Sequence, residues 1–398
     1  MFEGVRVLEV GTWIMVPAAA VLLADFGAEV IKVEHARSGD PARGLVTGGI
    51  TPNQGAVNLM VEQANRAKRS IGLDLGSDQG RDLLYELAAR ADVFMTSFLP
   101  DAREKLRIDV DDIRAVNPAV IYAKADAVGP EGPEGGKPGY DAAVFFGRAG
   151  ILNSFTPSGA PLVRPRPGFG DKTASLSLAY GIASALYRRE RDGTASVVDV
   201  SLLGSAMWVA SSDIVYSAAL GSDFSRLERP ATNPVATHYA TSDGRWIMLS
   251  MLESQRWWGP LCRALGHEEL AADPRYSDAA SRAANAEECR EALARIFASG
   301  SLADWRTRLG ALRAPWEVVA DSAEVSVDPQ AVANGYMATV THPSGEQIRV
   351  VRSPVVFDGR SPDVGTAPEF AQHTEEILLE LGHSWEEIVE LKSAGTIP

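Results

Sequence analysis

The sequence predicts an α/β protein with two domains, and three features of the chain support this. Predicted strands and helices alternate over residues 1–125, which is typical of a parallel sheet covered by helices. The chain has 398 residues, more than one hydrophobic core usually holds. A polar, turn-rich stretch at 221–236 then interrupts the pattern. We therefore expect a large doubly wound (Rossmann-like) domain and a smaller α+β domain.

The chain opens with a predicted β-α-β unit. Residues 5–10 (VRVLEV) and 28–34 (AEVIKVE) have the apolar pattern of buried strands. A loop at 11–17 leads to a helix of small residues, which is expected to stop at Gly27. The turn before this helix has no GxGxxG motif, and that motif is what lets a pyrophosphate approach the helix. A nicotinamide or flavin enzyme is therefore disfavoured.

The alternation continues to residue 220. Residues 129–139 hold many glycines and prolines, which predicts a surface loop before a helix that starts near Tyr140. A helix at 172–189 has apolar residues every three or four positions, and this spacing predicts one buried face. That face would consist of Leu176, Ala179, Tyr180, Ala183, Leu186 and Tyr187. A strand and a long apolar helix are expected to follow.

The second domain is expected to begin at residue 225. Residues 237–251 (THYATSDGRWIMLSM) predict a hairpin with its turn at Asp243 and Gly244. Helical segments follow, and the chain then returns to strands around a Pro-Ser-Gly turn before two short acidic helices. The predicted divisions are 1–224 for the large α/β domain, 225–325 for the small α+β domain, and 326–398 for a C-terminal segment that returns to the large domain.

Composition disfavours several classes of partner. The net charge of −14 argues against nucleic acid and anionic membranes, because like charges repel at long range. The two cysteines, Cys262 and Cys289, form no CxxC pair and have no histidine at ligand spacing, which predicts neither a disulfide framework nor a metal site. The start of the chain does not resemble a signal peptide, and no apolar run reaches about 18 residues. We expect a cytoplasmic protein.

The strongest candidate for chemistry lies in residues 161–189. Gly168, Phe169 and Gly170 lead to Asp171, directly before the predicted helix, and glycines permit a close approach that other residues prevent. An aspartate at this position is commonly an N-cap. It is also suited to be a nucleophile, because a carboxylate can attack an activated acyl group. The residues alone leave both interpretations open.

Basic residues gather on two polar loops that lead from or into predicted strands. They are His35, Arg37, Arg43, Arg66, Lys68 and Arg69. Arginine offers a planar fork and lysine a point charge, so loops of this kind suit phosphate groups. Scattered positive charge on a solvated loop explains the same pattern, and the two interpretations stay open.

Several segments, taken in order, resemble the family III coenzyme A transferases (CaiB/BaiF type), a family that includes the α-methylacyl-CoA racemases. The resemblance begins with LLADFGAEVIKVEHARSGDPARG and NRAKRSIGLDL. It continues through NPAVIYAKADAVGPEGP and PGYDAAVFFGRAG, and it extends through DGRWIMLSM and DPRY to SWEEI near the C-terminus. Each piece alone is weak, but the combination is specific and covers nearly the whole chain.

The resemblance implies an enzyme that moves CoA between an acyl-CoA thioester and a free carboxylic acid, without a metal or added cofactor. It also implies an interlocked, intertwined homodimer. The family's nucleophilic aspartate, which follows a glycine and opens a helix, corresponds to Asp171. Its mechanism passes through a mixed anhydride and an aspartyl-CoA thioester. Backbone N–H groups near Gly170 or after Gly129 would hold the oxyanion, and a helix N-terminus is expected to keep Asp171 ionised at neutral pH.

The resemblance also implies contacts to coenzyme A. The expected residues are His35, Arg37, Lys68, Arg69, Phe98, Lys105, Lys137 and Tyr140. Residues 97–101 (SFLPD) stand where many members have Asn-Phe-Arg-Pro-Gly, and residues 193–196 (GTAS) stand where they have Gly-Arg-Gly-Gln. The glycine-rich loop that some transferases of small acids carry near Met251 is missing. These departures leave the substrate open.

Two alternatives to CoA transfer remain at this point. In the racemase branch a histidine and an aspartate exchange a proton, but the corresponding triplet here is Gly139, Tyr140 and Asp141. Tyrosine has an ordinary pKa of about 10, so a racemase ranks second. The departures also suit a CoA-binding protein that has lost catalysis, although the retained Asp171 argues against this.

Overall fold

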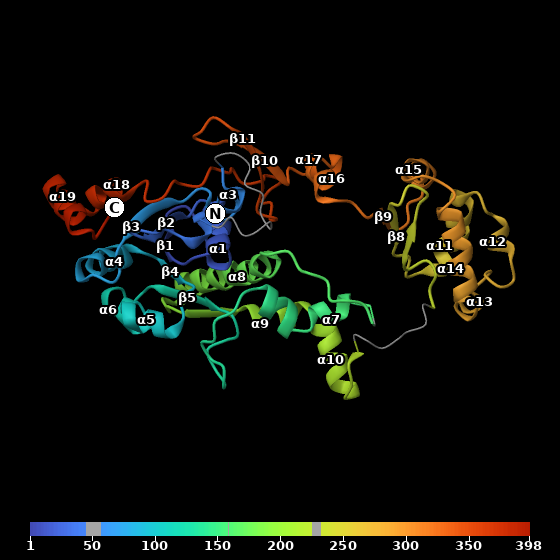
Figure 1. Cartoon of the computed structure of the whole chain (residues 1–398), viewed down its shortest axis with the longest axis horizontal. Coiled ribbons are helices and arrows are strands. Elements are labelled where there is room, and N and C mark those ends of the chain that lie inside the picture. The colour runs from blue at the N-terminus through green and yellow to red at the C-terminus, as the bar shows by residue number, and fades with distance from the viewer. Residues whose placement is uncertain (45–56, 158, 225–231) are drawn as a thin grey trace. The chain divides into compact units, whose positions relative to one another are not determined.

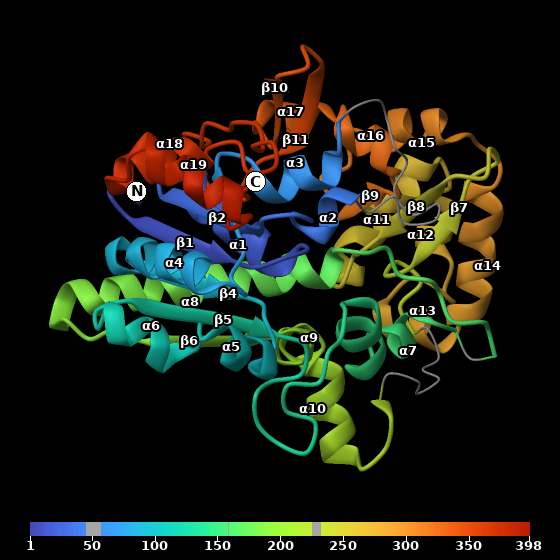
Figure 2. The same cartoon turned by 60° about the vertical axis from the view of Figure 1, so that its left-hand side comes forward.

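The computed structural model describes residues 1–44, 57–157, 159–224 and 232–398 (Figures 1 and 2). The chain divides into two compact units. Met1–Arg226 and Gln330–Pro398 form unit 1, and Leu227–Pro329 form unit 2. The boundary predicted at residue 225 lies outside the described residues. The return to unit 1 begins at Gln330, where the sequence predicted residue 326.

A parallel sheet of six strands forms the centre of unit 1, in the order β3-β2-β1-β4-β5-β6. The strands are β1 (Arg6–Val10), β2 (Glu29–His35), β3 (Arg69–Leu73), β4 (Val93–Thr96), β5 (Ile121–Asp126) and β6 (Val197–Ser201). The predicted doubly wound fold is therefore confirmed. The strand order reverses between β1 and β4, and sheets of this kind bind ligands at the carboxyl ends of the strands beside such a reversal.

Helices cover both faces of this sheet, because successive strand residues point to opposite sides. Val7 belongs to the core beneath α1 and α8, whereas its neighbour Leu8 belongs to the core beneath α4 and α6. These helices are α1 (Met15–Ala24), α8 (Phe169–Asp192), α4 (Asp78–Arg90) and α6 (Val110–Val116). The shorter helices of unit 1 are α2 (Pro41–Gly44), α3 (Leu59–Asn65), α5 (Pro100–Leu106), the π-helix η1 (Ala142–Arg148), α7 (Ile151–Phe155), α9 (Leu202–Val209) and α10 (Ser211–Leu220).

Three helices differ from the sequence prediction, and one of them is α8, which was predicted at 172–189 and spans Phe169–Asp192. Helix α1 begins at Met15, before the predicted start at Ala18, because a proline in the first turn, here Pro17, needs no hydrogen-bond acceptor for its nitrogen. The single long helix expected after β6 is two helices, α9 and α10, that meet at Ala210.

Helix α8 is apolar on two faces, and the sequence predicted the wrong one as buried. Leu176, Tyr180 and Tyr187 are 46%, 75% and 64% exposed. The residues that pack inward are smaller on average, and they include Ala174, Leu178, Ile182 and Ala185. Small side chains let α8 lie close to α1 and the sheet, so this face takes the inner position. The larger apolar residues are left at the surface of the chain.

The C-terminal segment covers the edge strand β3. It contains α17 (Pro329–Ala333), a hairpin of β10 (Met337–Thr341) and β11 (Gln347–Val351), and then α18 (Thr374–Leu381) and α19 (Trp385–Ala394). The backbone N–H of Gly72 donates to Oγ1 of Thr374 at 3.1 Å, and the N–H of Ser70 donates to Nδ1 of His373 at 3.1 Å. Figure 1 shows this segment, in red, beside the blue strands of the sheet. The predicted hairpin and closing helices are confirmed.

Unit 2 is a small α+β domain, as predicted. Its antiparallel sheet has the order β7-β8-β9, and the predicted turn between β7 and β8 is confirmed, with Gly244 at a φ of 73°. The elements are β7 (His238–Ala240), β8 (Trp246–Leu249), β9 (Trp316–Val318), α11 (Ser254–Leu265), α12 (Glu269–Ala272), α13 (Ala279–Ala284), α14 (Ala286–Phe297), α15 (Leu302–Leu309) and α16 (Ser322–Ser326). Trp258, Phe297 and Trp305 form the centre of its core, where Cys262 and Cys289 are buried as free thiols.

Candidate active site

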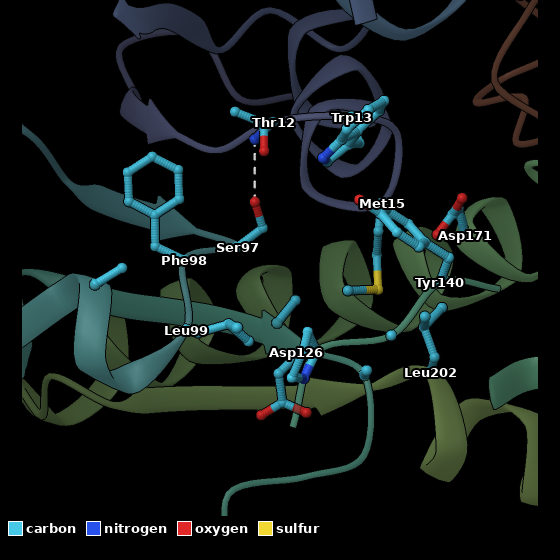
Figure 3. A pocket seen from close by; sticks show the side chains of 15 residues that line it. Thr12, Trp13, Met15, Ser97, Phe98, Leu99, Asp126, Tyr140, Asp171 and Leu202 are labelled. Atoms are coloured by element: carbon cyan, nitrogen blue, oxygen red, sulfur yellow. Dashed lines mark hydrogen bonds between the residues drawn. The ribbon is translucent and has the colours of Figure 1, made fainter. Parts of the chain in front are cut away.

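A cavity of about 340 Å³ lies at the carboxyl ends of β1 and β4, where the strand order reverses (Figure 3). We call it the Asp171 cavity. Its lining comes from the loops after β1, β4 and β5 and from the first turns of α8 and α9. The lining residues are Thr12, Trp13, Met15, Ser97, Phe98, Leu99, Ala102, Ala125, Asp126, Ala127, Pro138, Gly139, Tyr140, Asp171 and Leu202.

The loop after β1 is held in place by two hydrogen bonds. The N–H of Thr12 donates to Oγ of Ser97 at 3.0 Å, which ties this loop to the one after β4 (Figure 3). The N–H of Trp13 donates to Oδ1 of Asp40 at 3.2 Å. Trp13 has a φ of 69°, a conformation that costs a residue other than glycine about 1–3 kcal/mol. These bonds therefore hold Trp13 at the cavity in a conformation that it would not adopt alone.

Asp171 lies in the first turn of α8 and is not its N-cap. The helix begins at Phe169, and Gly168 occupies the N-cap position with a φ of 89°, which favours glycine. The N-cap interpretation of Asp171 is therefore wrong. Its carboxylate lines the cavity instead, and Figure 3 shows it on the same side of the cavity as Tyr140 and opposite Phe98.

The start of α8 is anchored on η1 by two neighbouring contacts. The N–H of Gly168 donates to Oδ2 of the buried Asp141 at 2.7 Å. A Cβ atom built on Gly170 would lie 2.6 Å from Cβ of Phe145 and 2.9 Å from Cβ of Asp141, so only glycine fits there. Sequence reasoning noted the glycines but missed the anchoring role of Asp141, and the only signal for it was an acidic residue just before a helix.

The Asp171 carboxyl group has an unusual electrostatic environment. The pKa of Asp171 is raised to about 7, first by burial and then by the negative charge of Asp141, whereas Lys172 opposes the rise. The expectation that the helix N-terminus keeps this group fully ionised at neutral pH is therefore corrected. Near pH 7 the acid and the carboxylate forms of Asp171 therefore coexist.

A second cavity of about 400 Å³ adjoins the first, at the carboxyl ends of β1, β2 and β3. We call it the His35 cavity. Three of the predicted coenzyme A contacts, His35, Phe98 and Lys105, line it. Phe98 lines the Asp171 cavity as well, as do Thr12 and Ala102. One extended ligand can therefore reach both cavities by passing Phe98.

Lys68 and Arg69 line neither cavity. The Lys68 ammonium is buried, and its Nζ lies 2.6 Å from Oε2 of Glu9 and 2.9 Å from the carbonyl oxygen of Pro17. The Arg69 guanidinium pairs with Glu376 at 2.9 Å and with Glu380 at 2.8 Å. Both side chains hold parts of unit 1 together, a use that the sequence pattern did not reveal.

The predicted phosphate cluster is also not assembled at the sheet edge. Arg43 makes a bidentate pair with Glu34, with both nitrogens 2.7 Å from the carboxylate oxygens. Arg66 pairs with Asp25 at 2.7 Å. Arg37 remains largely solvent-exposed, with its guanidinium 3.7 Å from Asp74. Asp25 lies 41 positions before Arg66, and Glu34 lies on β2, nine positions before Arg43, so the basic residues alone gave no sign of these partners.

Tyr140 lies at the Asp171 cavity, whereas Lys137 does not. The Tyr140 side chain is 63% exposed, and its ring meets Trp13 edge to face at 5.6 Å between centroids. Lys137 forms an ion pair with Glu134 outside both cavities.

The racemase alternative gains no support from this arrangement. Asp141 does not line the Asp171 cavity, and its carboxylate accepts the Gly168 N–H. The described lining contains no histidine to serve as a partner base. Within the described parts of the chain, no group of three or more His, Cys, Asp or Glu residues is arranged to hold a metal ion.

Comparisons with known proteins agree on one family. Residues 2–374 match the family model described as CoA-transferase family III. The chain is 31% identical to (R)-2-hydroxy-4-methylpentanoate CoA-transferase of Clostridioides difficile, over 100% of this chain and 99% of the relative. It is 31% identical to cinnamoyl-CoA:phenyllactate CoA-transferase of Clostridium sporogenes, over 98% of this chain and 96% of the relative. The crystal structure of a CaiB/BaiF family protein from Brucella suis superposes with a TM-score of 0.83 at 27% identity, covering 96% of this chain and 99% of that one. The chain therefore belongs to CoA-transferase family III.

Proposed function

We propose that this family III CoA-transferase works through covalent catalysis by Asp171, moving CoA from an acyl-CoA thioester to a free carboxylic acid. The observation that carries this proposal is the position of Asp171. Its carboxylate lines a cavity at the reversal of strand order, next to a second cavity that holds three of the predicted coenzyme A contacts. A carboxylate so placed can meet a thioester carbonyl carbon.

Each step of the proposed reaction exchanges one acyl bond for another. An oxygen of Asp171 attacks the thioester carbonyl carbon, the C–S bond breaks, and CoA leaves as its thiolate. The thiolate then attacks the Asp171 carbonyl carbon of the resulting anhydride and releases the first acid as a carboxylate. The acceptor carboxylate attacks the aspartyl-CoA thioester, and the thiolate finally takes the acceptor acyl group and frees Asp171. Each bond that breaks is replaced by a bond that forms, so the reaction as proposed is redox-neutral and needs no redox cofactor.

Two features of the site support these steps. The first backbone N–H groups of α8, at Phe169 and Gly170, have no carbonyl partner within their helix, and they are candidates to stabilise the oxyanion of each intermediate. The enclosed position of Asp171, which raises its pKa, also limits the access of water to an anhydride formed there.

The aspartyl-CoA thioester is the species to trap. Incubation with a substrate acyl-CoA and then hydroxylamine should leave a hydroxamate on Asp171, detected by mass spectrometry of peptides. The same adduct should appear on Asp171 in the Asp126→Asn variant, which changes the other carboxylate of the cavity. Asp171→Asn should form no adduct and should lose at least about 1,000-fold in kcat. A fully active Asp171→Asn variant would refute the mechanism.

We also propose that the functional unit is a homodimer. Large apolar residues are exposed on the outer face of α8 and on α9 and α10. They include Leu176, Tyr180, Tyr187, Trp208, Val215 and Tyr216. Trp208 alone is 81% exposed, and large exposed apolar patches on a chain commonly mark sites of protein–protein contact. A second copy of the chain is the partner that the family resemblance implies, in an interlocked arrangement.

A cytoplasmic location remains part of this proposal. Cys262 and Cys289 are both free and buried, and burial raises the pKa of each thiol to about 12, so neither is poised for disulfide exchange. Across the described parts of the chain, every helix is too short or too polar to cross a bilayer.

A further inference from the structure

The Asp171 cavity is apolar along most of its wall. Aromatic rings come from Trp13, Phe98 and Tyr140, and aliphatic side chains come from Met15, Leu99 and Leu202. Figure 3 shows Tyr140 and Leu202 on the side of Asp171 and Phe98 on the opposite side. A group attached to a thioester carbonyl at Asp171 would therefore meet hydrocarbon and aromatic surface, which gains free energy from apolar contact.

The same wall carries negative charge and no described cation. Asp126 and Asp171 are its acidic residues, and none of the described lining residues is Lys, Arg or His. Burial raises the pKa of Asp126 as it does that of Asp171, and the charge of Asp199 raises it further. The environment is thus poorly hydrated and disfavours any additional negative charge.

The basic side chains close to this site in the chain form ion pairs or line other cavities. Lys124 pairs with Asp199 at 3.1 Å, and Lys137 pairs with Glu134. Lys172 follows Asp171 in the chain, but it lines a separate groove with Leu59 and Leu176. The Lys105 ammonium and the His35 imidazole line the neighbouring His35 cavity. No described ammonium or guanidinium is therefore available for a second carboxylate on the substrate.

We infer that the acyl group handled at Asp171 is apolar and comes from a monocarboxylic acid, either aromatic or aliphatic, and that dicarboxylic acids are excluded. This inference rests on the proposed function. Every acceptor acid brings one carboxylate, which meets the N-terminus of α8 as it reacts. A dicarboxylic acid brings a second one, which would lie unpaired against the apolar wall and the Asp126 carboxyl group. A cavity of about 340 Å³ is also near the lower end of the range for ligand sites, about 300–1,000 Å³, which excludes long fatty chains.

Matched acids test this inference directly. With acetyl-CoA as donor, we expect pentanoate to accept CoA on the order of 100-fold better in kcat/KM than glutarate, which has the same number of carbons and a second carboxylate. A similar preference should hold for 3-phenylpropanoate over 3-(4-carboxyphenyl)propanoate. If glutarate is used as well as pentanoate, the inference is wrong while the proposed function stands. If no acid accepts CoA, the proposed function fails and the inference falls with it.

A variant with an added positive charge tests whether the absence of a cation causes this preference for monocarboxylic acids. Leu99 is half-buried at the cavity and has an extended backbone at the start of α5, which accepts any side chain. Leu99→Lys should move the glutarate-to-pentanoate ratio of kcat/KM toward glutarate by about tenfold, and the uncharged control Leu99→Met should leave the ratio near that of the parent. An unchanged ratio in folded, active Leu99→Lys would show that the missing cation does not set the selectivity.

Discussion

At the scale of single residues, Asp171 combines two properties that the sequence could not separate. Its place after Gly170 and at a helix start was readable, and so was its suitability as a nucleophile. Its protonation state could not be read from the sequence, because its pKa depends on burial and on Asp141. Asp141 lies 30 positions earlier but packs beneath the same helix turn. For the same reason the pairing of Lys68 with Glu9 was invisible, since it joins residues far apart in sequence.

The raised pKa of Asp171 predicts the pH dependence of the enzyme. Only the carboxylate form attacks, and this form increases as the pH rises through about 7. In the parent enzyme kcat/KM should therefore rise about tenfold per pH unit below pH 7 and level off above it. Initial rates between pH 5 and pH 9, at low acyl-CoA concentration, measure this profile.

Substitution of Asp141 should shift that profile. Asp141→Asn keeps an oxygen for the Gly168 N–H but removes a negative charge that raises the pKa of Asp171. The midpoint should move to lower pH. Asp126→Asn is the matched control, because Asp126 is not among the charges that shift Asp171, and its midpoint should stay in place. Equal midpoints in the parent and Asp141→Asn would contradict this account of the pKa.

At the scale of elements, the local pattern of apolar residues predicted the strands of the sheet and most helices. It did not predict which elements pack against one another. The apolar spacing of α8 correctly indicated a long helix, but the inner face was chosen by the fit of small residues against α1. The π-helix η1 was expected only as a helix near Tyr140. Its role became clear only in three dimensions, where Phe145 fills the space above Gly170.

Gly170→Ala should separate positioning from stability. The added methyl group would overlap Phe145 and push α8 away from η1, which moves Asp171. Such overpacking costs about 1–3 kcal/mol of unfolding free energy, and a shift near 1 Å in a reacting group lowers kcat on the order of 100-fold.

The same helix provides the control for that variant. A Cβ on Gly181 would lie 2.6 Å from Cγ1 of Val198, so Gly181→Ala should lower the melting temperature comparably. Because Gly181 is nearly three turns from Asp171, its kcat should stay within about threefold of the parent. Equal losses of kcat in both variants would indicate a general effect of instability.

At the scale of the whole molecule, the doubly wound sheet and the separate α+β unit were predictable from alternation and length. The sequence also predicted the return of the C-terminal segment to unit 1. It could not show which apolar face of α8 is exposed, because periodicity alone does not distinguish a face that packs against the sheet from one that lies at the surface of the chain.

The proposed homodimer predicts a concentration-independent mass of two chains by light scattering. Tyr180→Glu places a charge in the exposed apolar face of α8 and should weaken association by at least about 100-fold. Glu190→Gln, on an exposed polar position of the same helix, should leave the mass unchanged. A parent protein that is monomeric at micromolar concentration would contradict the proposal.

The hydrogen bonds that β3 makes to residues 373 and 374, and that Asp74 just after it makes to residue 396, have a consequence for synthesis on the ribosome. Strand β3 emerges early, but its covering segment is made some 300 residues later. At about 5–20 residues per second, the nascent chain carries an uncovered strand edge for roughly 15–60 s. During that interval the growing polypeptide is open to pairing with other unfinished chains, and this is the stage at which a chaperone would protect it most.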